Sequence, residues 1–144
     1  MSINSNIVHT QKCQSLMERL LIGDISFSQK ITNLLHCDYY GFNESYHVIV
    51  EYKSEVDQIG DAIVQILGYY HELTRLKIYN NGHLDKLGIK VFTPRESKLI
   101  IYYDGSEVVN FNKYIALYRS YIENPRCPQI HFVCHLDEDK LEIT

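Results

Sequence analysis

The sequence predicts a mixed α/β or α+β domain built around one central β-sheet flanked by helices. Two kinds of pattern support this: apolar residues at helical spacing, and short β-branched and aromatic runs. The two patterns alternate along the chain in the order helices, hairpin, long helix, strands, helix, strand. A chain of 144 residues has room for one hydrophobic core, so we expect a single domain over residues 1–144.

The helical segments are identified by their apolar spacing. Residues 10–22 form the first, which Gly23 ends, and residues 25–35 are compatible with a short second helix. A long helix is predicted over residues 55–76, where Ser54 and Asp57 resemble a capping box. Residues 112–122 are predicted to form the last helix.

The strands are predicted from runs of β-branched and aromatic residues. Residues 37–43 and 46–53 flank a short polar turn and are typical of a β-hairpin. After a turn at Asn81-Gly82, we expect further strands at residues 87–94, 97–104 and 129–136. The acidic tail that follows, over residues 136–144, is expected to be a solvated end.

Composition excludes several classes of protein. The net charge of −4 and the isoelectric point of about 5.9 argue, taken alone, against a general polyanion-binding protein. No apolar run approaches the roughly 20 residues of a membrane helix, and the polar N-terminus contains no secretory signal core. We therefore expect no membrane partner and a location in the cytoplasm or host-cell interior. In that reducing environment the four cysteines are expected to stay reduced, namely Cys13, Cys37, Cys127 and Cys134.

The strand at residues 46–53 carries the most informative polar residues. Strand alternation places Glu51 and Lys53 on one face. Asp38 begins the partner strand of the hairpin, so pairing brings it beside the Glu51 end. The sequence thus predicts two carboxylates and a lysine at one place.

This grouping suits metal-assisted hydrolysis of a phosphodiester. Asp38 and Glu51 supply the hard oxygen ligands that Mg²⁺ or Mn²⁺ prefers, and the main-chain carbonyl of Tyr52 is a natural third ligand. Lys53 is then able to orient or deprotonate the attacking water. Gln65 and Tyr69 share one face of the next helix, where they are suited to bind a phosphate or a base edge.

The order Asp38, Glu51-Tyr52-Lys53, then Gln65 and Tyr69 resembles the PD-(D/E)XK nuclease superfamily, in particular its RecB-like branch. The resemblance covers about residues 10–95 and implies a restriction-endonuclease-like core. It also implies that Asp38 and Glu51 ligate the metal, that Lys53 acts on the nucleophilic water, and that Gln65 and Tyr69 position the substrate or Lys53. The implied substrate is DNA, and small domains of this superfamily often form homodimers.

Several alternatives remain open at this point. Asp24 rivals Asp38 as the first carboxylate, although it is also suited to cap the helix that follows. Glu18 on the first helix and His36 upstream of Asp38 match acidic and histidine positions of some family members. A second hypothesis is a catalytically silent nuclease-fold module that binds nucleic acid or protein, and a third is that Glu51 and Lys53 form only a surface ion pair.

Overall fold

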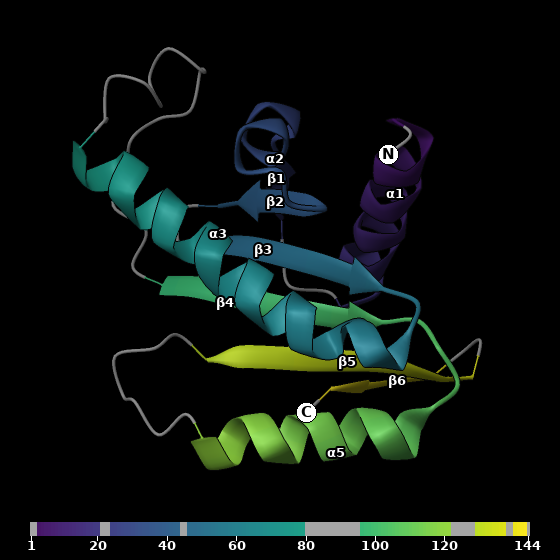
Figure 1. Cartoon of the computed structure of the whole chain (residues 1–144). Helices are drawn as coiled ribbons and strands as arrows, with labels where there is room; N and C mark the ends of the chain where they lie inside the picture. Colours follow the sequence, from purple (N-terminus) through teal and green to yellow (C-terminus); the bar gives the residue numbers. More distant parts are fainter. Residues whose placement is uncertain are drawn as a thin grey trace.

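The computed structural model describes residues 3–20, 24–43, 46–79, 96–121, 129–137 and 140–143. Its centre is a mixed six-stranded sheet in the order β1-β2-β3-β4-β5-β6, in which β3, β4 and β5 run parallel and the other neighbours antiparallel (Figure 1). The strands are β1 (Ser26–Phe27), β2 (Tyr39–Phe42), β3 (Tyr46–Lys53), β4 (Glu96–Tyr103), β5 (Ile130–Asp137) and β6 (Lys140–Ile143).

Helices cover both faces of this sheet. The α3 helix lies across β3 and β4 with α2 and α5 on the same face, whereas α1 packs on the opposite face (Figure 1). The helices are α1 (Ile3–Leu20), α2 (Gln29–Leu35), the 3₁₀ turn η1 (Val56–Gln58), α3 (Ile59–Tyr79) and α5 (Val108–Tyr121). The predicted mixed α/β fold with a central sheet flanked by helices is therefore confirmed.

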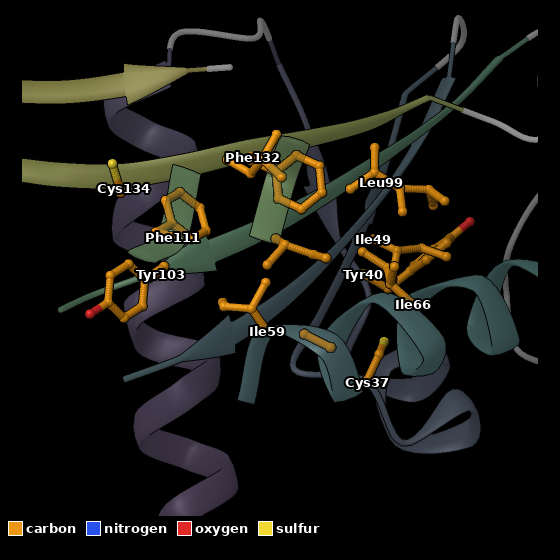
Figure 2. Close-up of a cluster of buried hydrophobic side chains, with 14 of the residues drawn as sticks. Cys37, Tyr40, Ile49, Ile59, Ile66, Leu99, Tyr103, Phe111, Phe132 and Cys134 are labelled. Atoms are coloured by element: carbon orange, nitrogen blue, oxygen red, sulfur yellow. The ribbon is translucent and has the colours of Figure 1, made fainter. Parts of the chain in front are cut away.

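The larger apolar core fills the space between the sheet and α2, α3 and α5. Figure 2 shows its aromatic centre, where Phe111 of α5 packs against Tyr103 of β4 and Phe132 of β5. The ring centroids lie 5.0 Å and 6.1 Å apart, spacings at which aromatic pairs are attractive. Ile49 of β3 and Ile66 of α3 are fully buried in the same cluster.

The smaller core lies between the sheet and α1. Cys13, Leu16 and Met17 of α1 pack there against Val48 and Val50 of β3. Because Ile49 belongs to the other core, successive β3 residues face opposite sides, as the alternation predicts. Cys13, Cys37 and Cys134 are buried and form no disulfide, which suits small apolar side chains.

The start of the long helix differs from the sequence prediction. No capping box forms at Ser54 and Asp57: the chain first makes the 3₁₀ turn η1, whose N-cap Glu55 makes no side-chain cap hydrogen bond. The turn closes through its backbone, with the N–H of Gln58 donating to the carbonyl of Glu55 at 3.1 Å. Asp57 lies inside this turn rather than at the third position of an α-helix, so its carboxylate cannot complete the box.

The acidic tail is the second difference. Residues 140–143 form β6, which pairs antiparallel with β5, so a strand occurs where the sequence analysis expects only an acidic end. The Lys-Leu-Glu-Ile segment alternates polar and apolar residues with the period of a strand. The acidic composition of the residues around it favours a solvated end instead, which is why the sequence does not predict this strand.

Other predictions fall outside what the structure describes. The turn at Asn81-Gly82 and the strand at residues 87–94 lie there, as does Cys127. Among the described helices, none combines the length and the apolar character needed to cross a membrane.

Candidate functional site

The candidate site lies beside the first residue of β2, where β3 extends past the end of its pairing with β2. Tyr39 pairs with Val50, and β3 then extends three residues beyond that pair. At this point the N–H of Tyr52 donates at 2.8 Å to Oδ2 of Asp38, the residue that directly precedes β2. A side-chain carboxylate thus replaces the strand partner that β3 lacks.

Glu51 lies beside Asp38 and is almost completely buried, with 4% of its surface exposed. Burial, together with the hydrogen bond to Asp38 and the negative charge of Asp38, raises the pKa of Glu51 to about 10. Oε2 of Glu51 is buried without a hydrogen-bond partner. Without a cation, burial beside Asp38 therefore favours the protonated form of Glu51 at neutral pH.

The main-chain carbonyl of Tyr52 faces the same edge as Asp38. The N–H and C=O of one strand residue point to the same side, and the N–H of Tyr52 points to Asp38. The next residue points the other way, since the carbonyl of Lys53 accepts a hydrogen bond from the N–H of Asp104 at 2.9 Å. The geometry thus directs the Tyr52 carbonyl to the side of β3 on which Asp38 lies.

Lys53 and Tyr69 complete the side of the site that faces α3. Half-buried Lys53 shares the Glu51 face of β3, and its positive charge partly offsets the rise in the pKa of Glu51. The hydroxyl of Tyr69 makes a hydrogen bond to Glu51, and burial together with the charges of Glu51 and Asp38 raises the pKa of Tyr69. Gln65, one turn earlier on α3, is exposed.

Two residues of α1 reach Asp38, and the sequence analysis did not identify either of them. Nδ1 of His9 lies 3.4 Å from Oδ1 of Asp38, and the hydroxyl of Thr10 donates to the Asp38 carbonyl at 2.6 Å. His9 lies before the helix predicted over residues 10–22 and Thr10 is its first residue, whereas in the structure the helix already begins at Ile3. Only tertiary packing of α1 on the sheet brings them to Asp38.

The other three candidate residues are exposed, unlike the carboxylate pair. Asp24 is exposed and does not cap α2, because Ser28 takes that position and accepts a bond from the N–H of Ile31 at 3.3 Å. Glu18 is exposed on α1, about 13 Å along the helix axis from His9. His36 is exposed and ends α2 in the left-handed region, with φ of 60°.

The donor set at this edge suits a hard divalent cation. In the part of the chain that the structure describes, no three His, Cys, Asp or Glu side chains gather as a metal-binding group. The edge instead offers two adjacent carboxylates and one main-chain carbonyl, oxygen donors that Mg²⁺ and Mn²⁺ accept together with water. A bound cation would give Oε2 of Glu51 a partner and would lower the raised pKa of Glu51.

The negative character of this region extends to its neighbours. Burial raises the pKa of the Cys13 and Cys37 thiols, and the charges of Asp38 and Glu51 raise both further. The same two carboxylates act on Tyr69. Groups from α1, the Asp38 loop and α3 therefore all respond to one local negative charge.

Comparison of the chain with protein-family models, with curated proteins and with solved structures finds no match.

Proposed function

We propose that the protein is a divalent-metal-dependent nuclease that hydrolyses DNA phosphodiester bonds. The observation that carries the proposal is the buried Asp38–Glu51 pair, adjacent to Lys53 at an open strand edge. A second support is the order of elements, since a helix, a hairpin with the acidic residues, a helix and a further strand is the order expected of a RecB-like PD-(D/E)XK nuclease.

In this proposal each residue has a defined task. Asp38, Glu51 and the Tyr52 carbonyl bind Mg²⁺ or Mn²⁺, which supplies Lewis-acid activation of the phosphate and lowers the pKa of bound water. Lys53 orients the attacking water and offsets the charge that develops on the phosphate. Tyr69 holds Glu51 through its hydroxyl, and His9 holds Asp38.

The acidic net charge is compatible with this substrate. Part of the formal charge of −4 comes from Asp38 and Glu51, which a divalent ion would offset. DNA contacts are then expected from scattered basic residues rather than from one basic run. Two candidates for this role are Lys98, half-buried on β4, and Arg119, exposed on α5. Further candidates, whose side chains lie outside those that the structure describes, are Lys77, Lys86, Lys90 and Arg95.

The test is release of nucleotides from linear DNA in the presence of Mn²⁺. Lys53→Ala is expected to lower the rate by about 10-fold to 100-fold or more. This is the range for removal of a group that only supports the ligands of a metal site. Lys113→Ala on the exposed surface of α5 is the matched control and should leave the rate unchanged. Equal rates for the wild type and Lys53→Ala would contradict the catalytic proposal.

Calorimetry with Mn²⁺ separates this proposal from its main alternative. Heat of Mn²⁺ binding that disappears in Glu51→Gln supports the nuclease. A wild-type protein that binds no Mn²⁺ but retains DNA would instead favour the catalytically silent binding module.

A further inference from the structure

Tyr52 is held at both its main chain and its side chain. Its N–H donates to Asp38, and its hydroxyl donates to Oδ2 of Asp104, each at 2.8 Å. The residue is buried, with 7% of its surface exposed, and its ring packs in the smaller core beside Tyr102. Tyr52 is therefore fixed between one carboxylate of the candidate metal site and a second carboxylate outside it.

Asp104 binds the end of β3 in two ways. It directly follows β4, and its N–H donates to the carbonyl of Lys53 at 2.9 Å, while its carboxylate accepts the hydroxyl of Tyr52. The same residue thus anchors two consecutive positions of β3, both of which the proposed function uses. Asp104 belongs to none of the sequence motifs described above and lies more than 50 residues after Glu51.

Helix α1 connects to this anchor. Nζ of Lys12 lies 3.6 Å from Oδ2 of Asp104, and one turn earlier His9 approaches Asp38 and packs its ring 4.9 Å from that of Tyr52. Each carboxylate that holds Tyr52 therefore has a basic partner on the same helix. The contacts join α1, β3 and the end of β4 around a single residue.

We propose that Asp104 is a positioning residue of the metal site and acts through the hydroxyl of Tyr52. Because Tyr52 lies between Glu51 and Lys53, fixing its ring also fixes the peptide groups on both sides. The Tyr52 carbonyl then stays directed to the Asp38 side of β3. The side chains of Glu51 and Lys53 stay on the face of β3 that α3 covers. This inference rests on the proposed function, because it assigns Asp104 the task of holding ligands in place for the cation.

The test removes the bond from each side and measures Mn²⁺ affinity by calorimetry on the full chain. Tyr52→Phe deletes one oxygen and keeps the main-chain carbonyl, and Asp104→Ala deletes the acceptor. Each variant is expected to weaken Mn²⁺ binding about 10-fold, the lower end of the range for groups that orient metal ligands. Asp104→Asn keeps an acceptor oxygen and should restore most of the affinity.

Two controls separate positioning from general stability. Tyr114→Phe removes a tyrosine hydroxyl from α5, away from the site, and should leave Mn²⁺ affinity unchanged. Thermal unfolding of every variant shows that the binding measurements are made on folded protein. In the double variant Tyr52→Phe/Asp104→Ala, the loss should equal that of the larger single loss, because both changes break the same bond.

The outcomes distinguish this inference from the proposed function. Wild-type binding of Mn²⁺ with unchanged affinity in Tyr52→Phe and Asp104→Ala overturns the role of Asp104 and leaves the metal site intact. Absence of Mn²⁺ binding by the wild type overturns both. On DNA, the inference further requires that Tyr52→Phe lower kcat with little change in KM, and a change confined to KM contradicts it.

Discussion

Ile49 and Glu51 occupy the same face of the same strand and are buried almost equally, with 0% and 4% of their surfaces exposed. Ile49 packs in the larger apolar core, where every contact favours the folded state. Glu51, two residues later, brings a carboxyl group into the protein with Oε2 lacking a hydrogen-bond partner. Equal burial therefore stabilises the fold at Ile49 and costs free energy at Glu51, so stability alone does not explain a carboxyl group at this position.

The largest effect expected from this comparison is at Ile49. Ile49→Ala removes buried methyl groups and leaves a cavity between the sheet and α3, so the free energy of unfolding should fall by about 2–5 kcal/mol. Urea denaturation measures this change, with Val64→Ala as the control because Val64 is 71% exposed on α3. If Ile49→Ala lowers the free energy of unfolding no more than Val64→Ala does, the conclusion that packing at Ile49 stabilises the fold is wrong.

The second expected effect is the pH dependence that Glu51 imposes on stability. Its pKa is about 10 in the folded protein against 4.5 as the ordinary value, so the folded state binds the proton more tightly than the unfolded chain. The stabilisation is complete below about pH 4.5 and is lost as pH rises toward 10. Across that window, the metal-free protein should lose at least about 1–3 kcal/mol, the cost of a buried polar group without a partner.

Glu51→Gln tests this effect directly. Glutamine has nearly the same shape and no titrating proton, so the variant should lose the pH slope and be more stable than the wild type at pH 9. Thermal unfolding between pH 5 and pH 9 in the presence of a chelator measures both. Parallel profiles for the two proteins would show that Glu51 does not hold the proton.

The smallest effect concerns the turn that leads into Asp38. His36 has a φ of 60°, a conformation that costs a residue with a Cβ but not glycine. His36→Gly is expected to raise the free energy of unfolding by about 0.5–1 kcal/mol. Asn33→Gly inside α2 should lower the free energy of unfolding. Chemical denaturation of the two variants shows whether the backbone at His36, two residues before Asp38, is strained.

The fold was largely predictable because its signals are local. The hairpin that carries Asp38 and Glu51 and the long helix after it follow from apolar periodicity and turn residues, and both are confirmed. The failures occurred where backbone geometry or pairing decides the outcome. Ser54 and Asp57 have the composition of a capping box, yet the chain turns as a 3₁₀ helix there, and the tail gains its structure only by pairing with β5.

The candidate site was predictable in part for the same reason. Asp38, Glu51 and Lys53 lie within one hairpin, so strand register alone predicts that they meet. Tyr69 follows from the helix directly after that hairpin. His9 and Asp104 come from elements that reach β3 only through packing, and no spacing within the sequence predicts which of their side chains will point to Asp38 or Tyr52.

The sheet order has a consequence for how the protein forms. In the part of the chain that the structure describes, each strand from β2 to β6 lies beside the strand that precedes it. If these strands form in chain order, each one joins an existing sheet edge, and none of the described strands has to insert between two others. Asp38 and Glu51 come together through an antiparallel hairpin with a short connection, whereas the parallel addition of β4 must close a much longer loop. The two carboxylates are thus brought together by a short hairpin, whereas Asp104 follows a strand that pairs across a much longer connection.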